Sequence, residues 1–531
     1  MRGHGPATAG QGGTSGARRR VDERRPRRCG AGTVVVLAAL TAVLGRFLGL
    51  LFPSGGDEAG FTLVARAWDP RPDSLYGPYW VDRPPPLIAL FKLSDQLGGP
   101  FLIRAVAAAG CLMAVLAAAA AARAVLRHMG VSDEGRVARA GAWCAVLAAA
   151  LTSSGMIDPV SAKGEILGIP LVLVSLWLSL TAVARPRPDA AALAIACGAG
   201  LTAAGALGAK QNLVAGLVFG AALLTGSVLD RRIGVGHGLR LAAAALVGAA
   251  VPVIATAGWA VASGVRLETL WYATYGFRAD AAAAIALGGP GAPAARALLL
   301  VAVFVATGGG FVLLLMLVQA RRILGRHRVL SVSAALVVGT DVVGLLLGGS
   351  FWRSYLFVFV PGLVLAAAML LALDGGPARA MRRLVVVAAA STVVSLTVGA
   401  VLIRVGALVP GEVRTGEAIA RASEPGDTIV SYGGRPSLVL ASGLRSPYRH
   451  LWSLPMRTLD PGLKDLRALL AGPDAPTWLV LWVPTSAWHD TGRPLEPVVE
   501  QRYELHGLGC WDRPVYLLKA AERPALEPRC D

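Results

Sequence analysis

Stretches of about 20 apolar residues recur along this chain, and they limit what it can fold into. A helix of that length crosses the hydrocarbon core of a bilayer. Apolar residues make up 55% of the 531 residues and charged residues only 16%, against about 25% charged in an average soluble domain. The sequence predicts an all-α polytopic membrane protein with about eleven transmembrane helices. The predicted spans are 31–52, 101–122, 138–154, 164–184, 190–208, 211–229, 241–263, 297–318, 329–348, 354–373 and 384–406.

The net charge of +18 could indicate a nucleic-acid-binding protein. Residues 407–531, however, hold 14 Lys and Arg against 15 Asp and Glu, so the whole positive excess lies in residues 1–406. There the basic residues occupy short segments between apolar runs, whereas a nucleic-acid-binding protein gathers them on one folded face. We therefore expect membrane lipid, and no nucleic acid, as a partner.

The distribution of Lys and Arg also predicts the orientation in a cell membrane. With the N-terminus inside, the cytoplasmic segments together with Arg139, just inside the third span, hold 24 Lys and Arg, and the outer loops hold 10, as the positive-inside rule requires. Residues 1–30 are rich in Gly, Ser and Arg and are predicted to be a disordered basic cytoplasmic tail. An odd number of spans then predicts an extracytoplasmic C-terminal domain in this multi-pass protein.

Residues 407–531 differ in composition from the rest, because Gly, Pro and charged residues return there. Thr428–Tyr432, Trp478–Val483 and Val515–Lys519 have the pattern of short buried strands. Asp460–Leu470 has helical spacing, with Asp460-Pro461 as the expected cap and first turn. The sequence predicts a small extracytoplasmic α/β domain over 407–531, after a transmembrane domain over 31–406.

Cys510 and Cys530 are the two cysteines that share a polar region. In an oxidising outer compartment they can form a disulfide, and closing that loop stabilises a fold by roughly 3 kcal/mol in the chain-entropy model. Two free thiols are the alternative, since Cys530 is next to last. The chain contains no CxxC or Cys/His metal spacing. No cofactor is required by the sequence, and a divalent metal is neither required nor excluded.

The first outer loop, 53–100, opens with the adjacent carboxylates Asp57 and Glu58. Adjacent carboxylates at a membrane surface repel each other and lose solvation. We therefore expect one of the two to have a raised pKa, as a general base needs. The alternative is a solvated pair on an ordinary loop.

Arg83 precedes three prolines near the end of the same loop. The proline run is expected to hold the backbone extended and to fix Arg83 at the membrane surface, where it could bind a lipid-linked phosphate. The alternative is an Arg that reaches lipid headgroups. Other polar residues lie on the same predicted side and suggest a cavity that opens outward. They are Arg66, Asp82, Lys92, Arg104, Lys163, Glu165, Lys210, Asp341, Arg353 and Tyr355.

Several motifs, in order, resemble the GT-C superfamily of integral membrane glycosyltransferases, in particular the protein O-mannosyltransferase and aminoarabinose-transferase branch. They are the Asp57-Glu58 pair after the first span, the Arg-Pro-Pro element at the end of the loop, IRAVAAAG at 103–110, GALGAKQNLVAG at 205–216, WRSYLFVFVPGLVLAAA at 352–368 and EPGDTIVSYGGRPSLVLASGLRSPYRH at 424–450. The resemblance covers most of 31–450.

This resemblance implies a transferase of the inverting type that takes a sugar from a polyprenyl-phosphate-linked donor at the outer leaflet. Asp57 would be the base or the residue that positions the acceptor, and Glu58 is the second candidate for that role. Arg83, where many relatives carry Lys, would hold the donor phosphate together with Lys210 and Arg353. The acceptor could be a glycan, a lipid or a protein. A transporter or lipid flippase, a non-catalytic relative and an oligosaccharide ligase are the alternatives.

Overall fold

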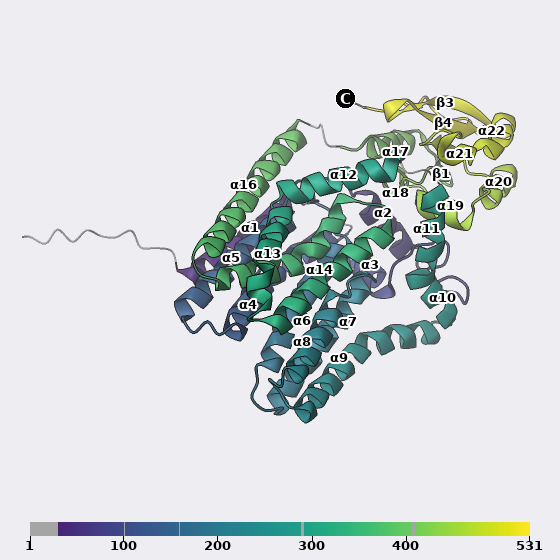
Figure 1. The fold of residues 1–531 in the computed structure, drawn as a ribbon. Helices are drawn as coiled ribbons and strands as arrows, with labels where there is room; N and C mark the ends of the chain where they lie inside the picture. Colours follow the sequence, from purple (N-terminus) through teal and green to yellow (C-terminus); the bar gives the residue numbers. More distant parts are fainter. Residues whose placement is uncertain (1–29, 100, 159, 288–290, 406–408, 531) are drawn as a thin grey trace, which may run out of the picture.

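The computed structural model describes residues 30–530 except 100, 159, 288–290 and 406–408. A bundle of helices carries a small α/β domain at one end (Figure 1). Nearly all of the predicted basic tail, Cys29 included, and the predicted domain boundary between residues 406 and 407 lie outside the described residues.

The bundle consists of long apolar helices. They are α1 (Ala31–Phe47), α4 (Leu102–His128), α5 (Glu134–Ser153), α6 (Gly164–Val183), α7 (Ala190–Ala209), α8 (Ala215–Leu229), α9 (Val235–Ala262), α12 (Gly291–Ala306), α13 (Gly309–Leu324), α14 (Arg328–Gly348), α15 (Val360–Ala372) and α16 (Gly376–Arg404). Within the described residues, seven helices are long and apolar enough to cross a membrane, or eight if one bent pair forms a single span. The chain is therefore a multi-pass membrane protein, and the number eleven stays a prediction.

The predicted span 297–318 is wrong as a single helix. It is divided between α12 and α13 at Thr307–Gly308, where Gly308 has a φ of 86°. Three consecutive glycines, 308–310, allow this left-handed turn, which other residues rarely adopt. The segment before α15 also differs from a regular helix, since Arg353–Phe359 (η3) is a 3₁₀ turn.

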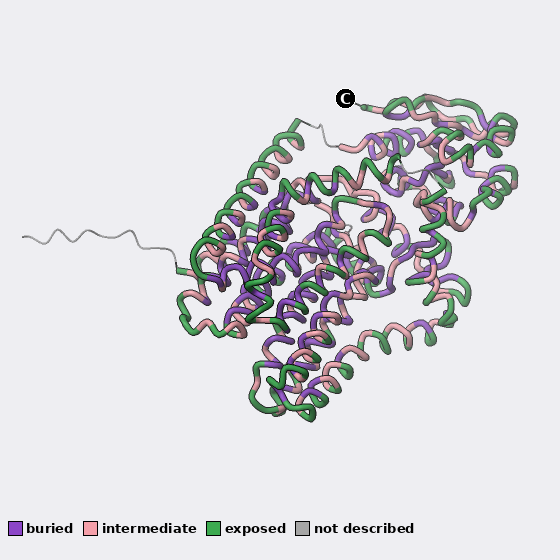
Figure 2. Tube along the Cα trace, in the orientation of Figure 1, coloured by how far each residue is buried: buried purple, intermediate pink, exposed green. Residues whose placement is uncertain are grey.

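Burial separates the centre of the bundle from its outside (Figure 2). The segment 353–372 is 89% buried, whereas the most apolar windows of α9 and α16 are only 11% buried. Exposed apolar side chains on these two helices include Val247, Ile254, Val387 and Val394. In a bilayer such surfaces face lipid, so α9 and α16 are peripheral helices around a protein-packed centre.

Shorter elements connect the bundle at the end that carries the α/β domain. They are η1 (Leu48–Leu51), α2 (Gly56–Arg66), α3 (Pro85–Gly98), α10 (Leu267–Trp271), a π-helical turn η2 (Tyr272–Gly276) and α11 (Phe277–Leu287). The prediction of an extended proline run is wrong beyond Pro84. Pro84 is extended, but Pro85 and Pro86 form the first turn of α3, where their missing N–H groups are not needed.

The C-terminal domain is a four-stranded mixed sheet with helices. Its elements are α17 (Gly411–Ala422), β1 (Ile429–Tyr432), α18 (Pro436–Ser442), α19 (Ser453–Leu459), α20 (Lys464–Ala471), β2 (Trp478–Leu481), α21 (Ala487–Asp490), η4 (Arg493–Leu495), α22 (Glu496–Arg502), β3 (Tyr503–Gly509), η5 (Cys510–Asp512) and β4 (Arg513–Leu518). The strand order is β1-β2-β4-β3, with β1 and β2 parallel and the other pairs antiparallel.

The expected strands of this domain are present as β1, β2 and β4, and β3 is an additional strand. The helix predicted from Asp460 begins at Lys464 instead. The Asp460 carboxylate nevertheless accepts hydrogen bonds from the backbone N–H groups of Asp465 and Leu466, at 3.2 and 3.1 Å. Asp460 therefore does cap α20, although the helix begins at Lys464 rather than directly after Asp460.

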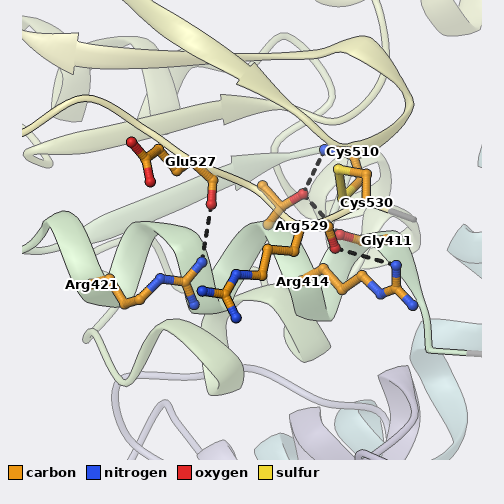
Figure 3. The surroundings of a disulfide bond; sticks show 8 residues. Gly411, Arg414, Arg421, Cys510, Glu527, Arg529 and Cys530 are labelled. Atoms are coloured by element: carbon orange, nitrogen blue, oxygen red, sulfur yellow. Dashed lines mark hydrogen bonds between the residues drawn. A yellow bond between two sulfur atoms is a disulfide. The ribbon is translucent and has the colours of Figure 1, made fainter. Parts of the chain in front are cut away.

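A disulfide joins Cys510 to Cys530, with Cα atoms 5.3 Å apart. It attaches the C-terminal segment beside α17 (Figure 3). Arg421 and Arg414 of α17 donate hydrogen bonds to the carbonyl oxygens of Glu527 and Arg529, at 3.0 and 3.2 Å. The last residues are thereby packed along the helix that follows the bundle.

Candidate active site

Asp57 and Glu58 lie in the first turn of α2 rather than on an irregular loop. Helix α2 begins at Gly56, and the Glu58 carboxylate accepts a 3.4 Å hydrogen bond from the backbone N–H of Gly55. Carboxylates are favoured in a first turn because the free N–H groups and the helix dipole are positive there. Consecutive helical residues point about 100° apart, so these two side chains enter different surroundings.

Glu58 lies in a closed ion pair. Its carboxylate meets the Arg104 guanidinium of α4 at 2.6 Å, and both side chains are only 2% exposed. The backbone N–H of Ala162 donates a second hydrogen bond at 2.6 Å. Arg104 also donates to the carbonyl oxygens of Phe52 and Pro53. Because its oxygens already have these donors, Glu58 is placed to join α2 to α4 and to the segment after η1 rather than to accept a proton from a substrate.

Asp57, by contrast, is partly open, with 34% of its side chain exposed. Its carboxylate lies 3.6 Å from Nζ of Lys163, which also pairs with Asp158 at 3.3 Å. The indole of Trp452, from the C-terminal domain, lies near Asp57 and helps to lower the pKa of its carboxyl. The same indole lies over Gly60 one turn further along α2, where any Cβ would overlap it.

The expectation of a raised pKa is wrong for Asp57. Burial alone would raise the pKa of this carboxyl, but the positive charges of Lys163, Arg83 and Lys210 lower it below the ordinary value, and the nearby Trp452 indole adds to this. The sequence argument considered only the repulsion from Glu58. Arg104 neutralises Glu58, so the surrounding cations decide the direction of the shift.

Arg83 and Lys210 are the other two cations of this cluster. Arg83 is 13% exposed, pairs with Asp82 at 2.7 Å and lies over the ring of Phe61. Burial by itself would lower the pKa of its guanidinium, but the carboxylates of Asp82 and Asp57 raise it. Lys210 is 7% exposed, and its Nζ lies 2.5 Å from Glu165. Both cations therefore lie beside a carboxylate in a site of low solvent content.

Asp82, Glu165 and Tyr355 complete the arrangement that the sequence predicted. The ammonium of Lys210 lies 4.1 Å from the ring centre of Tyr355, and the Tyr355 hydroxyl influences Arg83 electrostatically. Asp82 also pairs with Arg278 of α11. Five of the predicted residues, Asp82, Arg83, Glu165, Lys210 and Tyr355, thus lie in one charged cluster with Asp57.

Other predicted residues have different partners in the described part of the chain. Arg66 of α2 pairs with Asp95 of α3 at 2.8 Å. Lys92 of α3 lies over the ring of Trp68, which follows α2. Both contacts therefore hold α3 against α2 and the residues just after it. Arg353 is exposed and donates to the carbonyl oxygen of Met156. This hydrogen bond directs Arg353 to the turn after α5 rather than to the charged cluster.

Sequence reasoning missed three residues of the cluster, Asp158, Arg278 and Trp452. Asp158 pairs with Lys163 within the short segment between α5 and α6, whereas Arg278 of α11 meets Asp82 only through packing of distant segments. Trp452 follows the motif at 424–450 directly, yet nothing in its local pattern indicates a contact with α2. Asp341 is buried in α14, and its Oδ2 has no hydrogen-bond partner among the described residues.

The described residues contain no group of three or more His, Cys, Asp or Glu side chains arranged to hold a metal ion. The carboxylates of the cluster are each paired with a Lys or Arg instead. The arrangement suits an anion held by cations beside one open carboxylate.

Comparison with solved structures decides the fold. ArnT from Cupriavidus metallidurans, bound to undecaprenyl phosphate, has a TM-score of 0.58 at 16% identity, over 92% of this chain and 98% of that chain. The chain has the GT-C fold. AglB, the archaeal oligosaccharyltransferase from Archaeoglobus fulgidus in complex with an inhibitory peptide and a dolichol-phosphate, has a TM-score of 0.52 at 13% identity, over 90% and 73% of the two chains.

The apo state of the same ArnT gives a TM-score of 0.57 at 15% identity. No protein-family model matches the chain, and no curated protein matches its sequence. The GT-C resemblance that the motifs indicated is therefore confirmed at the level of the fold.

Proposed function

We propose that this protein is a membrane glycosyltransferase that moves a sugar from a polyprenyl-phosphate-linked donor to an acceptor hydroxyl on the extracytoplasmic face. The observation that carries the proposal is the half-open Asp57 carboxylate among Lys163, Arg83 and Lys210. The two structural neighbours hold undecaprenyl phosphate and dolichol-phosphate, and these lipids support a donor of that chemistry.

The proposed reaction needs one carboxylate and a phosphate-binding site. The acceptor oxygen forms a bond to the anomeric carbon while the bond from that carbon to the phosphate oxygen breaks. The departing phosphate keeps the electron pair, and Asp57 receives the hydroxyl proton. Because the acceptor hydroxyl becomes strongly acidic as its oxygen bonds to carbon, a carboxylate of low pKa suffices if it is well positioned.

The environment of Glu58 supports a single displacement. A double displacement needs a second free carboxylate as the nucleophile, and Glu58 is closed off by Arg104 and the N–H of Ala162. One open carboxylate fits a direct attack, which inverts the configuration at the anomeric carbon.

Arg83 and Lys210 are the proposed phosphate ligands. Each is paired with a carboxylate in this structure, Arg83 with Asp82 and Lys210 with Glu165. A donor phosphate placed between the two cations would share their hydrogen bonds, and a preorganised, poorly solvated cation stabilises the charge on the leaving phosphate. Arg353 is proposed only as an outer contact, because its side chain is exposed.

Donor turnover tests the proposal. The purified full chain is mixed with a panel of polyprenyl-phosphate sugars, and released polyprenyl phosphate is measured. We expect release with one class of donor, and loss of that release in Asp57→Asn. The matched control is Asp95→Asn, which removes a carboxylate of the same outer loop paired with Arg66. Normal turnover in Asp57→Asn and Glu58→Gln, and in the double variant, would show that these carboxylates are not the active site. No release from any donor by the unaltered chain would return the transporter and the non-catalytic relative as explanations.

The proposed orientation has its own test. The C-terminal domain and the charged cluster lie at the same end of the bundle, because Trp452 contacts α2. An alkaline phosphatase fused after residue 420 should therefore be active outside the cell. Activity of a cytoplasmic reporter at the same position would place the cluster on the wrong side for the proposed donor.

A further inference from the structure

A cavity, separate from the charged cluster, lies at the end of the bundle that carries the C-terminal domain. Its volume is about 430 Å³, inside the ~300–1,000 Å³ range of small-molecule sites. The first outer loop, the α10–η2 segment and the C-terminal domain form its walls. Its lining includes Asp73, Trp80, Glu268, Tyr272, His450 and Asp465.

The walls of this cavity are fixed to one another by hydrogen bonds. The backbone N–H of Trp80 donates to the carbonyl oxygen of Arg449 at 3.0 Å, which joins the outer loop to the C-terminal domain. The carbonyl oxygen of Pro72 accepts from the backbone N–H of Arg266 and from the hydroxyl of Thr269, at 3.2 and 2.8 Å. The cavity is therefore preformed rather than a gap between loosely placed parts.

His450 lines this cavity, and its side chain carries a buried polar atom without a partner. The residue is 3% exposed, and its Nδ1 has no hydrogen-bond partner in the described part of the chain. Burial, with the neighbouring Arg449 charge, lowers the pKa of His450 to about 4, so the ring is neutral near pH 7. A buried imidazole nitrogen without a partner is costly, and a ligand hydroxyl would satisfy it as donor or acceptor.

The remaining lining selects for a particular ligand chemistry. Trp80 packs against Phe277 with ring centres 4.3 Å apart, and together with Tyr272 it offers an aromatic surface on which the C–H face of a sugar ring can pack. Asp73, Glu268 and Asp465 accept hydrogen bonds from hydroxyl groups. Three carboxylates against the one guanidinium of Arg449 make the cavity negative, so an anionic ligand is repelled.

The cavity also has the right position for a substrate of the charged cluster. Trp80 precedes Asp82-Arg83 by two residues, and His450 precedes Trp452 by two. Trp452 packs against Phe61 and Gly60 of α2, the helix that carries Asp57. Both walls thus continue directly into the residues around the open carboxylate.

We propose that this cavity is the acceptor subsite of the transferase, and that it takes a carbohydrate without negative charge. The proposal rests on the proposed function and adds the class of acceptor to it. Trp80 of the cavity packs on Phe277, whose neighbour Arg278 pairs with Asp82 of the charged cluster, so the two sites share adjoining residues.

Binding without any donor tests the acceptor subsite separately from the transfer reaction. Saturation-transfer NMR on the full chain in lipid nanodiscs would use methyl α-mannoside as the neutral probe and glucuronate as the anionic probe. We expect the methyl mannoside signal to be at least ~5-fold stronger than the glucuronate signal. His450→Leu should remove most of that signal, and His450→Gln, which keeps a hydrogen-bonding group, should retain about half.

A charge variant separates recognition from folding. Asp73→Asn combined with Glu268→Gln changes two exposed residues and should strengthen glucuronate binding several-fold. The control Glu500→Gln removes an exposed carboxylate elsewhere on the C-terminal domain and should change neither probe. Equal binding of the two probes, or binding unaffected by both the His450 and the charge variants, overturns the proposal. Donor turnover by the unaltered chain is measured in parallel, so that a failed transferase assay with intact, charge-selective sugar binding is recognised as failure of the proposed function alone.

Discussion

Asp57 and Glu58 are neighbours in the sequence and opposites in the structure. Glu58 is 2% exposed and paired with Arg104, whereas Asp57 is 34% exposed and surrounded by three cations at longer distances. The closed pair joins α2, α4 and the segment after η1, and the open carboxylate lies in the charged cluster. The comparison teaches that one turn of helix can carry a structural and a chemical carboxylate side by side, separated only by the angle between successive residues.

The largest expected effect comes from Asp57→Asn. This change keeps the size of the side chain but removes the proton acceptor, so turnover of the donor should fall by ~10²–10⁴-fold. Thermal unfolding should change little, because Asp57 is the more exposed carboxylate. Donor turnover and thermal unfolding of the same preparation are measured. A variant that is inactive because it is unfolded would mean that Asp57, like Glu58, has a structural role.

Glu58→Gln should act mainly on stability. Breaking one side of a buried ion pair costs about 3–5 kcal/mol, since Arg104 keeps a buried charge without its partner. The measurement is the unfolding midpoint in detergent, with the double variant Glu58→Gln/Arg104→Met as the control. The double variant should be less destabilised than the sum of the two single variants. Additive losses would show that the two groups are not coupled.

Trp452→Phe distinguishes the two carboxylates, because it removes the indole N–H group near Asp57 and leaves the surroundings of Glu58 unchanged. A hydrogen bond to a charged group stabilises it by about 1.5–3 kcal/mol, so we expect a roughly tenfold lower turnover. Trp511→Phe, at an exposed tryptophan of the same domain, is the matched control. Equal rates in both variants would mean that the indole only covers Gly60.

The pH dependence is the smallest expected effect. The pKa of Asp57 is lowered, so this carboxylate stays ionised as the pH falls past its ordinary value of about 4. The ion pairs that lower it add stability above the unfolded pKa, and this stability is lost as the pH falls through the folded pKa. We therefore expect kcat/KM to be flat from neutral pH to about pH 5. An acid limb between about pH 6 and 7 would instead indicate the raised pKa expected of a conventional general base.

The long apolar runs predicted most of the bundle, because a run of that length leaves few alternatives to a helix that spans the membrane. It failed at Gly308, where the apolar run continues although the backbone turns. In the C-terminal domain, β3 escaped detection since Tyr503–Gly509 mixes charged, polar and apolar residues and its central residues are not buried. Local patterns describe composition, whereas these breaks depend on packing.

The residue types of the candidate site were predictable, but their pairing was not. The order of motifs indicated Asp57, Arg83 and Lys210, and the structure brings these three together. The sequence could not show that Arg104 forms an ion pair with Glu58, since the two residues are 46 positions apart. It also could not place Trp452, which reaches α2 only when the C-terminal domain has docked.

The contact between Trp452 and α2 also bears on when the protein becomes active during its synthesis. Helix α2 is made early, but the indole that covers Gly60 and lies near Asp57 comes almost four hundred residues later. A nascent chain that has completed the whole bundle still lacks one wall of the carboxylate site and of the neighbouring cavity. The order of residues along the chain thus delays completion of this site until the C-terminal domain has been made and has folded onto α2.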